Sequence, residues 1–191
     1  MTDETLLELA ERGDEAAFLQ LYERHRDAMF RFAYRLLGSV ELAEDVTQDC
    51  FLSLIKRPRS FDPLRAGLRT YLFAAVRNLS LKHFRRSGQE VTVEDLTLEP
   101  RVPESEEPLG KLLDQEMSAA VARAIAALVP LQREALILFE YEGLTLAEIA
   151  SVVGADTGTV KARLHRARQA LRRSLEPYFK SHTERMTVER P

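Results

Sequence analysis

A short basic segment is the part of the chain best suited to binding a polyanion. Residues 154–168 contain four cations and one acid, Asp156, whereas the whole chain has a formal net charge of −3. The four cations are Lys161, Arg163, Arg166 and Arg168. Such groups bind phosphate oxygens, and Arg side chains can also reach the edges of DNA bases. The segment therefore predicts a surface that holds a nucleic acid backbone and reads its bases.

The residues around this segment predict a helix-turn-helix. Thr145 and Glu148 form a capping box, in which each side chain satisfies an amide of the first helical turn. Gly154 permits the tight turn, and a second helix begins near Thr157. At 100° per residue, one arc of the second helix is apolar and should pack inward. That arc consists of Val160, Leu164, Ala167 and Leu171.

The opposite face of the second helix is cationic and carries hydrogen-bonding groups at its centre. This pattern suits the major groove of DNA, where flanking cations contact phosphates and central side chains contact base edges. We expect Arg166 to read a base and the other three cations chiefly to bind phosphates. The alternative is a helix whose charges only face water. The candidate DNA-binding residues are Thr159, Lys161, Ala162, Arg163, His165, Arg166, Arg168 and Gln169.

A second basic block lies in the first half of the chain. Residues 56–86 contain nine Lys or Arg, one acid and four aromatic residues. Cations interleaved with rings suit an opened DNA strand, because stacking contributes roughly 1–3 kcal/mol per base. Asn78 is a poor helix former whose amide suits a base edge, with a satisfied polar residue at a helix contact as the alternative. Tyr71 either stacks on a base or packs in the core.

The residues between the two basic blocks are acidic. Residues 88–116 contain nine acids and two cations, and residues 87–113 combine prolines, glycines and acids. Such a composition buries too little apolar surface to offset chain entropy, so residues 87–113 are expected to form a flexible acidic linker. The expected domains are residues 1–86 and 114–176, followed by a tail at residues 177–191.

The periodicity of apolar residues predicts an all-α fold of two small helical domains. Apolar residues recur at helical spacing outside the linker and residues 57–67, and strand signals are almost absent. After Asp14, an apolar stripe runs along one helix face until Gly38, which can end that helix. The further helices are expected at residues 40–56, 68–86, 114–128 and 131–142.

The helix at residues 40–56 carries more apolar surface than a small core needs. Phe51, Leu52 and Ile55 widen its apolar side, while Glu44, Asp45, Gln48 and Asp49 gather on another side. A partner surface would explain the excess, and burial against the first helix is the alternative for Phe51.

Composition excludes several classes of protein. With 191 residues, 45% hydrophobic and 30% charged, the chain is typical of a soluble globular protein. Without an apolar run near 18 residues and with an acidic start, we expect a cytoplasmic protein without membrane insertion. Cys50 stands alone, so it is expected in the core, without a disulfide, metal site or cofactor.

Three motifs together resemble one family. The stretch "GLTLAEIASVVGADTGTVKARLHRARQAL" resembles region 4 of bacterial sigma factors of the extracytoplasmic-function group. The stretches "AEDVTQDCFLSLI" and "LRTYLFAAVRNLSLKHFRR" resemble the polymerase-docking helix and the promoter-melting helix of region 2. The resemblance covers nearly residues 10–176. It implies a sigma factor without catalysis, which binds core RNA polymerase, directs it to promoters and helps to open the duplex.

The resemblance also implies partners and residue roles. The recognition helix would face the −35 element, with Lys161, Ala162, His165 and Arg166 at matching positions. The partners implied are promoter DNA, the clamp of the β′ subunit, the β flap and, as for many relatives, an anti-sigma protein. The −10 candidates are Phe61, Tyr71, Asn78, Lys82, Arg85 and Arg86. The core polymerase docking candidates are Asp45, Gln48, Asp49 and Leu52.

Other functions fit the residues less well. A helix-turn-helix regulator with a sensory first domain would need a ligand pocket or phosphoacceptor site, and the pattern shows neither. A nuclease would need clustered carboxylates with metal-binding partners, whereas Glu44, Asp45 and Asp49 lie on a helix without nearby His. A purely structural protein would not need two cationic faces.

Overall fold

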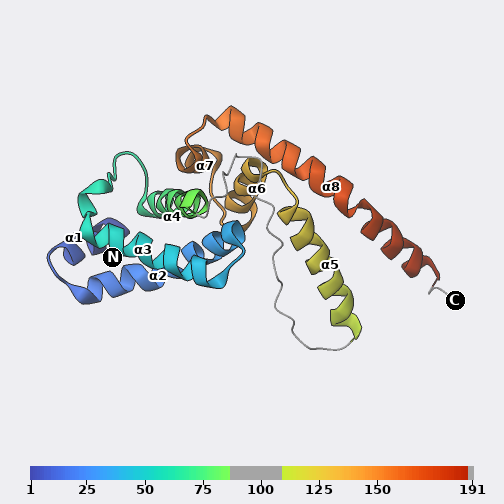
Figure 1. Ribbon diagram of the computed structural model, residues 1–191, viewed down its shortest axis with the longest axis horizontal. Helices are drawn as coiled ribbons and strands as arrows, with labels where there is room; N and C mark the ends of the chain where they lie inside the picture. The colour runs from blue at the N-terminus through green and yellow to red at the C-terminus, as the bar shows by residue number, and fades with distance from the viewer. Residues whose placement is uncertain (87–108, 189–191) are drawn as a thin grey trace.

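The protein is built from helices, and the computed structural model describes residues 1–86 and 109–188 of it. Side chains are described for residues 1–83 and 117–178. These residues form two helical domains without a strand, which confirms the expected all-α class (Figure 1). The predicted linker lies largely outside the described residues, and only its end, residues 109–113, falls within a helix.

The first domain consists of four α-helices and one short 3-10 turn. The bounds are α1 (Asp3–Glu11), α2 (Glu15–Leu37), α3 (Val40–Lys56), η1 (Pro58–Ser60) and α4 (Leu68–Arg86). The helices α2, α3 and α4 confirm the expected positions. Asp14 caps α2 by accepting a hydrogen bond from the amide of Ala17 at 3.0 Å, and Gly38 ends α2 with φ 68°.

The helix α1 was not predicted from the sequence. It packs against α2, where Oδ2 of Asp3 lies 2.8 Å from Nε2 of the buried His25. Oδ1 of Asp3 also accepts a hydrogen bond from Arg24 at 2.5 Å. One carboxylate therefore fastens the start of the chain to two neighbouring positions of α2.

The apolar stripe of α2 forms the centre of the first domain. Leu21, Met29 and Phe32 are fully buried on it, and the ring of Phe32 meets Phe73 of α4 edge to face with centroids 5.2 Å apart. Cys50 of α3 is 1% exposed, as expected for a core residue. Burial raises the pKa of the Cys50 thiol to about 12.

The second domain contains the helix-turn-helix. Its bounds are α5 (Leu109–Ala126), α6 (Pro130–Leu136), the π-helix η2 (Ile137–Tyr141), α7 (Leu146–Val153) and α8 (Thr157–Val188). The helix expected at residues 131–142 is thus an α-helix that widens into a π-helix. The last helix is longer than expected, because α8 runs through Pro177 to Val188, into the expected tail.

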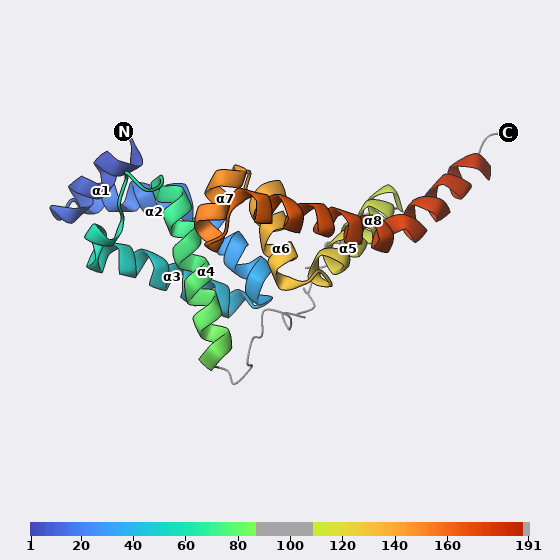
Figure 2. The ribbon, with the colours of Figure 1, turned by 90° about the horizontal axis from the view of Figure 1, so that it is seen from above.

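The two domains touch each other. The helix α4 packs against α7, and α2 meets η2. Figure 2 shows α4 (green) beside α7 (orange), with α8 extending away from the first domain. This contact was not predicted from the sequence, which indicated only two domains and a connector.

Candidate nucleic-acid interface

The capping box fixes the first helix of the helix-turn-helix as predicted. The amide of Thr145 donates to Oε2 of Glu148 at 2.8 Å, and the amide of Glu148 donates to Oγ1 of Thr145 at 3.3 Å. The hydrogen bonds from Thr145 hold the pKa of the Glu148 carboxyl below its usual value. Gly154 then ends α7 with φ 66°, in the left-handed region that the turn requires.

Asp156 caps the recognition helix α8. Its Oδ1 accepts a hydrogen bond from the Thr159 amide at 2.8 Å, and its Oδ2 accepts one from the Thr159 hydroxyl at 2.6 Å. These hydrogen bonds lower the pKa of the Asp156 carboxyl. The single acid of the basic segment therefore serves the helix start, and Thr159 is occupied within the chain.

The recognition helix presents most of the predicted face to solvent. Val160, Leu164 and Ala167 are buried beneath it, as the periodicity predicted. Leu171, the last member of the predicted arc, is half-buried. The exposed candidates are Lys161, Ala162, His165, Arg166, Arg168 and Gln169.

Of the expected phosphate-binding cations, one is ion-paired within the protein and another is half-buried. Arg168 donates through Nη2 to Oε1 of Glu140 at 2.7 Å, and its guanidinium lies 5.2 Å from the centroid of the Phe139 ring. Arg163 is half-buried, and its Nη1 is buried without a hydrogen-bond partner among the described residues. Arg168 is thus exposed but ion-paired, whereas Arg163 is partly withdrawn from solvent.

The −10 candidates on α4 divide into exposed and packed residues. Asn78 and Lys82 are exposed, whereas Tyr71 is half-buried and Phe61 is only 9% exposed. The Phe61 and Tyr71 rings meet edge to face at 5.6 Å, and the Tyr71 hydroxyl lies 2.6 Å from Oγ of Ser60. These two rings pack on each other in this conformation.

The last two −10 candidates, Arg85 and Arg86, lie in the final turn of α4. Their side chains lie outside the described residues, so their expected DNA contacts stay a prediction.

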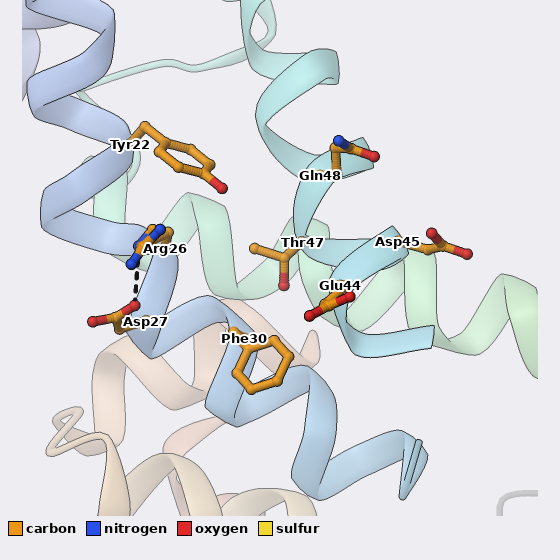
Figure 3. Close-up of a pocket in the computed structure, with 8 residues that line it drawn as sticks. All are labelled: Tyr22, Arg26, Asp27, Phe30, Glu44, Asp45, Thr47 and Gln48. Atoms are coloured by element: carbon orange, nitrogen blue, oxygen red, sulfur yellow. Dashed lines mark ion pairs between the residues drawn. The ribbon is translucent and has the colours of Figure 1, made fainter. Parts of the chain in front are cut away.

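The docking candidates of α3 are exposed, and two of them border a groove. A cavity of about 460 Å³ lies between α2 and α3, with Asp45 and Gln48 among its lining residues. Figure 3 shows the rings of Tyr22 and Phe30 entering this groove from α2, and an ion pair between Arg26 and Asp27 beside them. The other two docking candidates, Asp49 and Leu52, do not line the groove.

The excess apolar surface of α3 is smaller than expected. Phe51 is 2% exposed and its ring meets Tyr22 edge to face at 5.0 Å, so burial in the chain's own core accounts for it. Leu52 and Ile55 are 42% and 47% exposed. Of the three residues expected to widen the apolar side of α3, only these two remain for a partner surface to cover.

The sequence reasoning missed the ion pairs between the domains. Nε of Arg77 in α4 donates to Oε1 of Glu134 in α6, and Nη1 of Arg35 in α2 lies 3.1 Å from Oε1 of Glu142. No local pattern signals these pairs, because Arg77 and Glu134 are 57 positions apart.

Two further features are absent from the described residues. No helix among them is both long and apolar enough to cross a bilayer. Their side chains also contain no group of three or more His, Cys, Asp or Glu that could hold a metal ion.

Comparison with known families accounts for both domains. The model of sigma-70 region 2 matches residues 21–90, which contain α3 and α4. The model of sigma-70 region 4 matches residues 118–171, which contain the helix-turn-helix. The chain belongs to the sigma-70 family. We call its domains the region 2 domain and the region 4 domain from here on.

Similar proteins place the chain in the extracytoplasmic-function (ECF) group of this family. The ECF sigma factor SigE of Mycolicibacterium smegmatis is 35% identical over 84% of this chain. The match covers 63% of the length of SigE, which is less than two thirds of that protein. The sigma-H factor of Pseudomonas aeruginosa is 30% identical over 93% of this chain and 96% of its own length. The sigma factor RpoE of Bartonella quintana, solved with the anti-sigma factor NepR, is 28% identical with a TM-score of 0.65, over 83% of this chain and 96% of RpoE.

Proposed function

We propose that this ECF sigma factor binds core RNA polymerase and directs it to promoters that carry matched −35 and −10 elements. The observation that carries the proposal is the order of two modules in one chain, region 2 and then region 4. A polymerase partner distinguishes this function from that of a regulator that binds DNA alone. As a polymerase subunit, the protein would act in the cytoplasm and without a catalytic site of its own.

The −35 element would be read by α8. Its exposed centre carries His165, Arg166 and Gln169, whose hydrogen-bonding groups suit base edges. Lys161, Arg163 and Arg168 would contact phosphates, although Arg163 and Arg168 first have to leave their present surroundings. The capped start of α8 supports this role, because it fixes the orientation of the first turn.

The −10 element would be opened and read by α4. Asn78 and Lys82 are exposed on this helix, where an amide and a cation could meet a base edge and a phosphate. Tyr71 and Phe61 would stack on bases only after their edge-to-face contact is broken. Arg85 and Arg86 would extend the cationic track.

Core polymerase would dock on α3. Asp45, Gln48, Asp49 and Leu52 are exposed along this helix, and such a mixed polar and apolar strip suits a helical partner. By family resemblance the partner is the β′ clamp, with the β flap contacting the region 4 domain. Because RpoE was solved with an anti-sigma factor, we also propose an anti-sigma partner for this chain.

A holoenzyme assay tests the proposed function. The purified chain is mixed with core RNA polymerase and passed over a sizing column, and initiation is then measured on genomic promoter fragments. We expect a stable complex and start sites that depend on the added chain. Asp45→Lys should weaken the complex, whereas Glu23→Lys, an equal charge reversal on the exposed side of α2, should not. A chain that binds DNA but never associates with polymerase would show a regulator instead.

A further inference from the structure

Carboxylates of the region 4 domain hold cations of the region 2 domain where the two meet. Arg77 of α4 pairs with Glu134. Arg35 of α2 pairs with the carboxylate of Glu142, while Nη2 of Arg69 in α4 donates to the backbone oxygen of Glu142 at 2.5 Å. Arginines from two helices of one domain thus meet Glu134 and Glu142 of the other.

These contacts are withdrawn from water. The Glu134 and Glu142 side chains are 8% and 1% exposed, and their partners Arg77 and Arg35 are 18% and 30% exposed. Burial raises the pKa of both carboxyls, and the nearby arginines oppose this rise. A buried carboxylate depends on an adjacent cation, so each glutamate needs its partner while the two domains are in contact.

Arg77 of α4 lies next to Asn78, one of the side chains proposed to read the −10 element. One residue corresponds to about 100° around a helix, so Arg77 flanks the side on which Asn78 is exposed. Phosphates of a strand whose bases face Asn78 would pass along such a flank, where cations bind them. The domain contact therefore leaves Asn78 exposed and occupies the cation next to it.

A second cation, Arg163, lies near Glu134. Arg163 lies on α8, which packs against the helix α6 that carries Glu134, and its charge partly opposes the rise that burial causes in the pKa of the Glu134 carboxyl. The buried Nη1 of Arg163 has no hydrogen-bond partner among the described residues. In the present arrangement Arg77 forms the ion pair with the Glu134 carboxylate. If Arg77 left with the region 2 domain, Glu134 could pair with Arg163, so that domain separation would exchange one ion pair for another.

We propose that Arg35, Arg69 and Arg77 form a phosphate-binding face of the region 2 domain, which Glu134 and Glu142 occupy while the chain is free. The glutamates take the place of DNA phosphates, so DNA and the region 4 domain compete for the same cations. On opening, Glu134 exchanges Arg77 for Arg163. The proposal rests on the proposed function only in naming promoter DNA as the natural ligand.

Neutralising the glutamates in the full chain tests this competition. Glu134→Gln and Glu142→Gln should each raise the affinity for a short, random-sequence single-stranded oligodeoxynucleotide several-fold. Small-angle X-ray scattering should show a larger radius of gyration for both variants. Glu23→Gln, an equal charge change at an exposed position of α2, is the control. It should leave the radius of gyration unchanged, and it should change the affinity only by the small amount expected from removing one negative charge elsewhere on the surface. Unchanged affinity in both glutamate variants, or expansion without a gain in affinity, would overturn the proposal.

A double variant assigns the gain to its cation. Adding Arg77→Gln to Glu134→Gln should abolish the gain and reduce the slope of log K against log salt by about 0.7, as expected for one lost phosphate contact on a single strand. If the double variant binds as tightly as Glu134→Gln, Arg77 does not contact phosphate and the proposal fails.

The unsubstituted chain supplies a test that does not depend on whether the variants fold. Saturating oligodeoxynucleotide should enlarge its radius of gyration, because DNA displaces the glutamates, and an unchanged radius would overturn the proposal. Holoenzyme assembly is measured separately. If the chain does not assemble with core polymerase, the proposed function is rejected, but the competition between DNA and the glutamates is not. If initiation is normal but DNA and the glutamates do not compete, only the present inference is rejected.

Discussion

The guanidinium of Arg168 rests against the carboxylate of Glu140, with 2.7 Å between Nη2 and Oε1. Two positions earlier on the same helix, Arg166 lies exposed near the centre of the outer face. The two arginines therefore differ in surroundings despite their identical chemistry. Arg168 flanks the face where phosphates would pass, and Arg166 occupies the part that would enter the groove.

Substitution should separate the roles of these two arginines. Arg166→Ala is expected to cost about 1–3 kcal/mol on the preferred −35 sequence and to relax discrimination at one base pair. Arg168→Ala should weaken binding to all sequences equally and reduce the salt slope by about one. Fluorescence anisotropy with a panel of duplexes at two salt concentrations measures both effects. An equal loss on every duplex for Arg166→Ala would remove its base-reading role.

The capping box predicts a pH dependence of the free energy of unfolding. The pKa of the Glu148 carboxyl is lowered from 4.5 by its hydrogen bonds with Thr145. A lowered folded-state pKa stabilises the fold above the ordinary value, and this contribution disappears as the pH falls through the lowered one. Glu148→Ala should therefore destabilise the protein at pH 7 and differ less from the unsubstituted chain at pH 3.

Denaturant unfolding at the two pH values checks this expectation. Thr145→Ala serves as the companion variant and should cost about 1 kcal/mol at pH 7, as is typical for the loss of an N-cap. An equal effect of Glu148→Ala at both pH values would show that its carboxylate charge does not contribute.

The Cys50 thiol should be inert in the folded protein. With its pKa raised to about 12 by burial, about one thiol in ten thousand would be ionised at pH 8, and only the thiolate reacts readily. Iodoacetamide should therefore modify Cys50 only in denaturant, which mass spectrometry detects directly. Modification at equal rates with and without denaturant would contradict the buried position.

Neighbouring residues of α3 should respond in opposite ways to truncation. Phe51→Ala removes a buried ring and should cost about 3–5 kcal/mol of stability. Leu52→Ala alters an exposed side chain and should change stability by less than about 0.5 kcal/mol. It should instead weaken core polymerase binding by about tenfold if Leu52 is an anchor of that interface. Thermal melts and a polymerase titration on the same preparations distinguish the two effects.

Local signals were sufficient for most of the helices. The positions of α2, α3, α4 and α7 followed from caps, glycines and the spacing of apolar residues, which act within a few positions. The helix α1 was not predicted although its local signals were present, since Thr2 caps its start and Leu6 and Leu7 form a buried side. Only its docking through Asp3 onto His25, 22 positions away, lies beyond local signals. The π-helix η2 escaped because an apolar run does not reveal the hydrogen-bond register of its backbone.

The candidate site was predicted less evenly. The exposure of Arg166 followed from helical periodicity alone, whereas the sequence left a helix contact open as the alternative for Asn78. The packing of Phe61 onto Tyr71 and the pairing of Arg168 with Glu140 did not, because an aromatic or charged residue at a given spacing can face solvent or a neighbour equally well.

The sequence by itself determined where most of the helices form, which of their faces are apolar and where the cations gather, since these properties depend on residues one or two turns apart. Only the tertiary structure decided which cations stay open to a ligand. Arg77 and Glu134 are 57 positions apart, and they pair because α4 packs beside the region 4 domain. The partner of a charge depends on which surfaces meet, and that is settled by the burial of apolar surface over the whole chain rather than by neighbours in the sequence.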